Sequence, residues 1–170
     1  MRSKNNFSIV VLIDNHGDSD MPQSLTKNYV HIIFSSKNRE PFLHSPVKEE
    51  LWDCLGGMCK ALECNPIHIG GYHDHVHVLC LLSKKLALMK LVEEIKTHSS
   101  KWLKAKGSEF SGFSWHLGYG AFSVNPAQWE AVAAHIEKQE EHHQEKSFQA
   151  EFRTILGKYK MDYDEHYLWD

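Results

Sequence analysis

Two hydrophobic periods divide this chain into segments, and each period predicts one kind of element. Runs of β-branched and aromatic residues predict strands near 29–34, 67–69 and 75–82, and a looser pattern with glycines predicts one or two more within 113–124. Apolar residues three and four positions apart predict helices over 46–64, 86–106, 126–143 and 147–158. This order predicts one α+β domain of the ferredoxin-like (RNA-recognition-like) type, an antiparallel sheet with helices on one face and an additional C-terminal helix.

The first 20 residues differ from the rest of the chain because they contain no sustained period. They end in a polar run from Asp14 to Asp20, which Met21 and Pro22 follow. We interpret residues 1–20 as an N-terminal arm, either disordered or translated from an upstream start codon, and residues 21–170 as the domain. A chain of 170 residues has the length of one domain with a single core.

Composition and charge narrow the class of protein. The chain is 42% hydrophobic and 24% charged, as globular proteins are, and it has no apolar run of membrane-spanning length. Its four cysteines lack CxxC spacing, which predicts reduced thiols in a cytoplasm. The net charge is −3, but the charges are unevenly distributed. Residues 137–170 are acidic, with nine acids and five bases, whereas residues 84–106 are basic, with seven lysines and two glutamates. Such a stretch is either a solvated helix face or a phosphate-binding surface.

Candidate chemistry is densest in the segment 70–82, GGYHDHVHVLCLL. On the predicted strand His75 and His77 share one face, and Val76 and Val78 share the other. Two imidazoles about 6 to 7 Å apart along a strand can hold one divalent cation if a third ligand comes from elsewhere. Taken alone, the pattern also fits buried histidines with hydrogen-bonded partners, or a zinc site of structural or hydrolytic use.

Four motifs in order resemble those of the small single-tyrosine HUH transposases, which serve minimal insertion sequences and their REP-associated relatives. The motifs are VHIIFSSKNR at 30–39, GYHDHVH at 71–77, WHLGYGAFSV at 115–124 and IEKQEEHH at 136–143. The resemblance covers about residues 21–170. It implies a dimeric RNA-recognition-like fold that binds hairpins in single-stranded DNA and cleaves and rejoins DNA through a covalent 5′-phosphotyrosine with a divalent metal, Mg²⁺ or Mn²⁺.

The same resemblance assigns roles to particular residues. Its metal ligands are the two histidines and a glutamine on the late helix, which correspond here to His75, His77 and Gln139. Its nucleophilic tyrosine lies four residues before that glutamine and reaches the histidine pair of the partner subunit. In this chain the tyrosine position is occupied by His135. A phenolate is a good nucleophile and a tolerable leaving group, whereas histidine would have to form a phosphoramidate.

Three explanations fit this departure from the pattern. Cleavage has been lost while DNA binding is kept, another tyrosine such as Tyr119 substitutes, or the register of the late helix is shifted. The Glu-Glu-His-His run after Gln139 supports the register, so we expect loss or impairment of the nucleophile. In that run His142 and His143 either orient phosphates or the metal shell, or are surface histidines.

The predicted function is a transposase-like protein that binds hairpin single-stranded DNA and, if active, cleaves and rejoins it by metal-assisted transesterification. The alternative is a catalytically inactive, domesticated DNA-binding regulator of the same fold. We expect a homodimer, no membrane association, and a bacterial-type cytoplasmic location, on the nucleoid when bound to DNA. Candidate phosphate contacts are basic residues outside the metal site: Arg39, Lys84, Lys85, Lys90, Lys96 and Lys101.

Overall fold

The computed structural model describes residues 24–169, and the expected arm, residues 1–20, lies outside them. One antiparallel sheet has the strand order β2-β3-β1-β4. Its strands are β1 (Tyr29–Ser35), β2 (Asn65–Gly71), β3 (His75–Leu81) and β4 (Gly120–Val124). The helices are α1 (Val47–Ala61), α2 (Leu88–Lys104), α3 (Trp129–Glu137), α4 (Gln139–Glu145), α5 (Phe148–Lys158) and α6 (Glu165–Leu168), with 3₁₀ turns η1 (Lys37–Arg39) and η2 (Ser108–Phe110).

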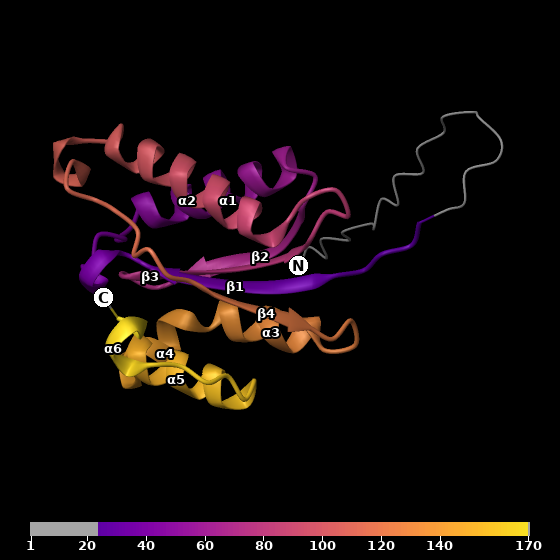
Figure 1. Ribbon diagram of the computed structural model, residues 1–170. Helices are drawn as coiled ribbons and strands as arrows, with labels where there is room; N and C mark the ends of the chain where they lie inside the picture. Colours follow the sequence, from indigo (N-terminus) through magenta and orange to yellow (C-terminus); the bar gives the residue numbers. More distant parts are fainter. Residues whose placement is uncertain (1–23, 170) are drawn as a thin grey trace, which may run out of the picture.

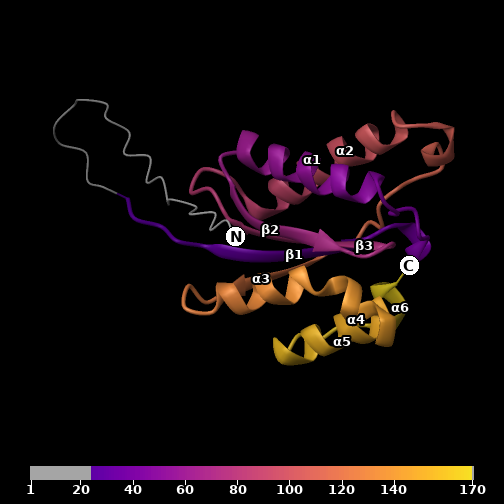
Figure 2. The same ribbon diagram turned by 180° about the vertical axis from the view of Figure 1, so that it is seen from behind.

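The sheet is the middle layer of three (Figures 1 and 2). α1 and α2 cover one face, and the C-terminal helices α3 to α6 lie on the other side. The strand order, with α1 and α2 as the connections between strands, is that of the predicted ferredoxin-like fold. The expected additional helix at the C-terminus is therefore present as part of a complete second helical layer.

One face of the sheet forms an apolar core with α1 and α2. Ile32 of β1 and Val76 and Val78 of β3 are fully buried there, as the alternation in the sequence predicts. Leu51 and Leu55 of α1 meet them at helical spacing. Burial of each such side chain stabilises the fold by about 1.5–3 kcal/mol. This core holds the framework that carries the opposite, more polar face.

The opposite face of the sheet mixes histidines with apolar side chains. Ile33 of β1 packs against Phe152 of α5 in a second apolar cluster. Between such contacts His31, His75 and His77 are buried, with 4%, 0% and 0% of their surface exposed. Because buried polar groups need partners, this is the face on which functional chemistry has to be sought.

Gly70 sets how closely α3 approaches the edge strand β2. A Cβ atom at this position would lie 2.8 Å from Cγ2 of Ile136 and 3.0 Å from the backbone oxygen of Ile136. Any side chain here would therefore push α3, which carries His135, away from the sheet. Both glycines of the pair belong to β2, which continues through Gly71, and the turn follows at 72–74.

Two predicted elements differ from the observed ones. Within 113–124 only β4 is a regular strand, and the segment before it pairs with Ser36, the residue after β1, through an isolated bridge from Trp115. The helix predicted over 126–143 is divided into α3 and α4, which meet at Lys138 with φ −94° and ψ 16°. No proline or glycine marks this break, so helical periodicity alone does not locate it.

Two expectations from composition concern the cysteines and the membrane. All four cysteines are free thiols, three of them buried. Across residues 24–169 no helix combines the length and the apolar character needed to cross a membrane.

Candidate metal centre

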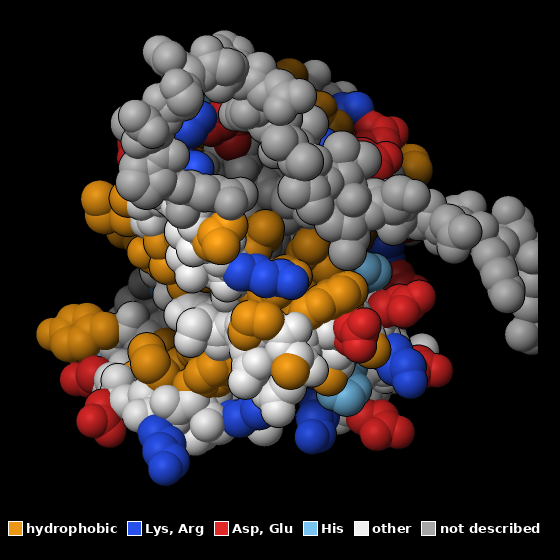
Figure 3. Space-filling model, turned by 90° about the vertical axis from the view of Figure 1, so that its right-hand side faces the viewer, with side chains coloured by type: hydrophobic (Ala, Val, Ile, Leu, Met, Phe, Trp, Pro, Cys, Tyr) orange, Lys and Arg blue, Asp and Glu red, His pale blue; other side chains and the backbone are white. Residues whose placement is uncertain are grey.

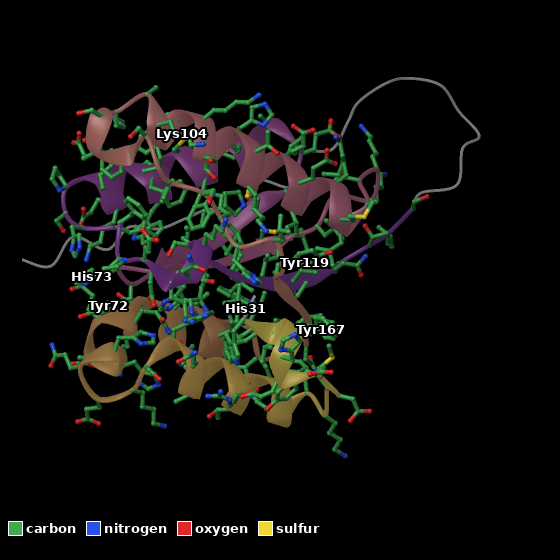
Figure 4. All side chains as sticks on the ribbon, turned by 60° about the vertical axis from the view of Figure 1, so that its left-hand side comes forward. His31, Tyr72, His73, Lys104, Tyr119 and Tyr167 are labelled. Carbon is green, nitrogen blue, oxygen red and sulfur yellow. The ribbon has the colours of Figure 1, made fainter. Side chains whose placement is uncertain are left out.

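β3 places His75 and His77 next to each other on the sheet face that carries the C-terminal helices. Both side chains are fully buried, and their ring centroids are 5.1 Å apart. His31 on the neighbouring strand β1 stacks on His77 with the same centroid separation of 5.1 Å. Figure 4 shows His31 in the layer between the sheet and these helices. The predicted pair of imidazoles therefore lies on one strand face, inside the protein.

α4 brings Gln139 to this pair. Its side chain is 1% exposed, and Oε1 lies 2.9 Å from Nε2 of His75. The amide nitrogen of Gln139 donates a hydrogen bond to Oε1 of Glu151 at 2.7 Å. Because that bond fixes the amide orientation, the oxygen of Gln139 faces the histidines. The fold thus brings together the three residues that the resemblance implies as metal ligands.

His135 faces the histidine pair of its own chain. It lies one helical turn before Gln139, and its ring centroid is 6.1 Å from that of His77. Its Nε2 is 2.6 Å from Oε1 of Glu151, and 32% of its side chain is exposed. The resemblance implies that this position reaches the partner subunit, whereas here it completes a cluster within one chain.

Glu151 and His143 were not predicted as ligands, yet both belong to the cluster. Glu151 of α5 is 4% exposed, and its Oε2 lies 2.9 Å from Nε2 of His143. The same oxygen is 3.7 Å from Nε2 of His77 and 3.8 Å from Nε2 of His75. These four side chains come from three elements, β3, α4 and α5.

The sequence does contain a signal for Glu151. It lies three residues after Phe148 and one residue before Phe152, both of which are buried. Glu151 therefore interrupts the apolar stripe of a helix, where a carboxylate is buried only if it has partners. A carboxylate in such a stripe, downstream of a His-x-His strand, is what could have located this residue.

The hydrogen bonds of two imidazoles direct their free nitrogens at a common centre. Nδ1 of His75 donates to Oδ1 of Asp74, and Nδ1 of His143 donates to the backbone oxygen of Lys146, both at 2.7 Å. In the neutral rings Nε2 is then an acceptor. Both Nε2 atoms nevertheless face Oε1 of Gln139, itself an acceptor, at 2.9 and 3.0 Å. Acceptors this close require a proton or a metal cation between them.

His77 contributes an atom without a hydrogen-bond partner. Its Nδ1 is 2.9 Å from Nε2 of His31, whereas its Nε2 is buried and makes no hydrogen bond to the part of the chain that is described. Burial lowers the pKa of His77 to about 4 and lowers the pKa of His31 well below its ordinary value. Both rings are therefore neutral at pH 7, and in the tautomer in which Nδ1 of His77 donates to Nε2 of His31, Nε2 of His77 has a lone pair for a ligand bond.

Glu151 supplies the negative charge of the cluster. Burial alone would raise its pKa, but hydrogen bonds from His135 and His143 hold the pKa of Glu151 well below its usual range. The carboxylate in turn raises the pKa of His143 above its ordinary value, against the effect of burial. In the metal-free chain a proton on His143 satisfies this contact, and a metal ion would replace that proton.

The donor set fits a divalent transition metal or zinc. Neighbouring ligand atoms around an ion with bonds of about 2.1 Å stand about 3.0 to 3.4 Å apart. The contacts among the donor atoms here span 2.9 to 3.8 Å. Imidazoles favour Mn²⁺ and especially Zn²⁺ over Mg²⁺, which prefers oxygen ligands and retains several waters.

The predicted phosphate contacts lie elsewhere. The five lysines belong to α2 or to the loop before it, across the sheet from the metal centre (Figure 1). Several have partners within the protein: Lys85 pairs with Glu63, Lys90 pairs with Glu93 and Glu94, and Arg39 lies over the ring of Trp169. Lys84 and Lys101 are exposed.

Lys96 makes structural hydrogen bonds within the protein. Its Nζ donates to the backbone oxygens of His116, Leu117 and Gly118 at 2.6, 2.9 and 3.2 Å. Burial lowers the pKa of Lys96 to about 8. This ammonium anchors the irregular segment before β4 to α2, which sets it apart from the exposed lysines.

Replacing Lys96 with methionine is expected to lower the free energy of unfolding by about 1–3 kcal/mol, because carbonyl groups lose their donor. Urea denaturation at pH 7 measures the change. Lys104→Met is the matched control, since Lys104 lies exposed on the same helix (Figure 4) and its loss should change stability by less than about 0.5 kcal/mol. Equal stability of the two variants would contradict the anchoring role.

Comparison with family models matches residues 24–139 to a family described as IS200-like transposases. The match ends at Gln139, so His143 and Glu151 lie outside it. No curated protein matches the chain significantly.

Two solved structures share the fold. A protein from Deinococcus radiodurans R1, described as a candidate transposase, is 20% identical, and the alignment covers 72% of this chain and 98% of that one with a TM-score of 0.56. A REP-associated tyrosine transposase bound to a REP hairpin is 12% identical over 74% of each chain, with a TM-score of 0.53. At these identities the likeness shows the fold, and it confirms the predicted α+β class.

Proposed function

This chain belongs to the IS200-like transposase family, and on that premise we propose that it binds hairpins in single-stranded DNA without forming a covalent link to DNA at position 135. Hairpin binding is supported by the family and by the structural relative that holds a REP hairpin. Loss of the covalent step is supported by the side chains of this chain. Of the two predicted functions, active transposase and inactive DNA-binding regulator, the geometry therefore favours the inactive regulator.

The hydrogen bond between Nε2 of His135 and Oε1 of Glu151, at 2.6 Å, carries this proposal. A nucleophile needs a free electron pair directed at phosphorus, and this nitrogen is held by a buried carboxylate. The position also lacks a phenol, so no phosphotyrosine can form there. In addition, the ionised Glu151 repels a phosphate that approaches His135.

A groove of about 1180 Å³ supports the approach of a DNA strand. Its walls come from the start of β1, the end of β4, α3 and α5, and they include Lys27, Lys158 and His135. Figure 3 shows this side of the molecule, where hydrophobic side chains gather around a basic one. Cations among apolar and amide side chains suit the backbone and bases of a single strand.

We also propose that a divalent ion binds to His75 and His77, with Gln139 beside them, and that Mn²⁺ suits the imidazoles better than Mg²⁺. In phosphodiester chemistry such an ion polarises the phosphate. The protein's own contribution is orientation, because His31 and Asp74 contact the Nδ1 atoms of the two ligands.

A second candidate function is cleavage and rejoining of DNA by metal-assisted transesterification, which the histidine pair favours. It requires another nucleophile. Tyr119 is 42% exposed, and Tyr72 stacks on His143 with ring centroids 5.2 Å apart. A covalent adduct formed by the unchanged protein would establish this function in place of the first.

A homodimer in a bacterial-type cytoplasm, on the nucleoid when bound to DNA, completes the proposal. The dimer is proposed from the resemblance. Since His75, His77, Gln139 and His135 meet within one chain, a second copy is not needed to assemble the cluster.

The protein is expected to bind a DNA hairpin with single-stranded flanks more tightly than an unrelated duplex, with affinity that falls steeply between about 50 and 200 mM salt. Lys27→Ala and Lys158→Ala should each reduce the salt slope by about 1, because each removes an exposed cation from the wall of the groove. Fluorescence anisotropy in chelator measures both quantities, with Lys60→Ala, an exposed lysine of α1, as the control. Equal affinity for hairpin and duplex would refute hairpin recognition.

A further inference from the structure

We propose that His143 and Glu151 are ligands of the same ion as His75 and His77, so that protein side chains alone complete a zinc-type centre. Both residues lie beyond residue 139, where the match to the family model ends. The inference rests on the proposed function only in that both concern the ion at this site. It is independent of DNA binding.

The carboxylate of Glu151 already stands near coordination separations from the three imidazoles. One ligand atom each of His75, His143 and Glu151 lie within 4.8 Å of one another. Oε2 of Glu151 is 2.9 Å from Nε2 of His143, 3.8 Å from Nε2 of His75 and 3.7 Å from Nε2 of His77. Bonds of about 2.1 Å in a tetrahedron separate ligands by about 3.4 Å, so the three contacts of Glu151 lie within about 0.5 Å of the separations in a coordination shell.

Each imidazole is oriented through its other ring nitrogen. Asp74 accepts from His75, the backbone oxygen of Lys146 accepts from His143, and His31 contacts His77. Protein zinc sites fix the tautomer of their histidine ligands in this way. The buried Nε2 of His77, which has no hydrogen-bond partner in the described chain, is the atom that an ion would satisfy.

α5 closes the site as well as supplying Glu151. The ring of Phe148, three residues before Glu151, stacks on His75 with centroids 4.4 Å apart and planes 21° apart. Phe148 is itself 6% exposed and packs in the second apolar cluster. The carboxylate and the aromatic ring thus cover His75 from the same helix.

A shell completed by protein has a functional consequence. Structural zinc sites are closed, whereas catalytic ones keep a position open for water or substrate. A DNA phosphate could bind the ion only by displacing a ligand such as Glu151. The metal centre therefore links α4 and α5 to β3. Because the shell has no open coordination position, it disfavours the phosphodiester chemistry that an open site would allow.

Zinc affinity of the full chain tests this inference without DNA or activity. The wild-type protein, purified without added metal, is expected to bind a single zinc ion, measured by competition with a chromophoric chelator. Glu151→Gln and His143→Gln should each weaken zinc binding by at least about 10-fold. Glu141→Gln on α4 and His98→Gln on α2 are the matched controls, because both residues are exposed.

X-ray absorption of the zinc-loaded wild type provides a measurement that needs no variant to fold. Three imidazole ligands are expected, and two would overturn the inference. The inference would also be overturned if the wild type bound no zinc. It would be overturned as well if the Glu151 and His143 variants bound zinc as tightly as the controls. Hairpin binding is measured in chelator and therefore does not depend on zinc. A failure to bind hairpins would contradict the proposed function and leave the inference about the metal ligands intact.

Discussion

Glu151→Ala is expected to lower the free energy of unfolding of the metal-free protein by about 3–5 kcal/mol, as removing one partner of a buried charged group does. Glu151 accepts hydrogen bonds from His135, Gln139 and His143 at 2.6, 2.7 and 2.9 Å. Without the carboxylate these three donors lose the acceptor that they share. Urea denaturation at pH 7 in chelator, followed by circular dichroism, measures the loss.

Glu141→Ala is the control for this change. Glu141 is exposed on α4, one element away, and its replacement should alter stability by less than about 0.5 kcal/mol. A loss below about 1 kcal/mol in Glu151→Ala would mean that the imidazoles satisfy one another without the carboxylate. That result would contradict the claim that the Glu151 carboxylate stabilises the surrounding imidazoles.

The double variant His135→Tyr with Glu151→Ala is expected to form a covalent adduct with single-stranded DNA in excess Mn²⁺, whereas the unchanged protein forms none. The first change supplies the phenol that the family's chemistry uses. The second removes the carboxylate that lies 2.6 Å from Nε2 of His135, where a phenol would otherwise be held away from phosphate. Loss of a nucleophile costs about 10⁶-fold in a well-studied hydrolase, so the contrast should be all or none.

Gel electrophoresis in detergent detects the adduct as a shift of labelled DNA to protein. His98→Tyr combined with Glu151→Ala is the matched control, since His98 is an exposed histidine on α2, across the sheet from the metal centre. His135→Tyr alone should remain inactive because Glu151 is still present. Absence of adduct in the double variant would show that the site differs from an active one by more than the nucleophile and its neighbour.

The local elements were largely predictable because each depends on nearby residues. Alternation of Val76 and Val78 with His75 and His77 predicted which side chains share a face of β3, and the burial of both sets bears this out. Helical spacing likewise predicted α1, α2 and α5. The break between α3 and α4 was not predictable, because no proline or glycine marks it.

The candidate site was predictable in part. Gln139 was placed with the histidines by resemblance, and the fold brings it 2.9 Å from His75. Glu151 was missed as a ligand because the histidine pair beside it, His75 and His77, lies 76 and 74 positions earlier in the sequence, and helical periodicity carries no information on such distances. The lysines were assigned to DNA from charge alone, which cannot separate the anchored Lys96 from the exposed Lys101.

By itself, the sequence determined the order of strands and helices, the shared face of His75 and His77, and the absence of tyrosine at position 135. These properties follow from spacing along the chain. Only the tertiary structure decided that α5 lies over the histidine pair and that Glu151 bonds His135 and His143 there. The reason is physical: a carboxylate is buried and ionised only where the folded chain gathers enough donors around it, and those donors come from separate elements.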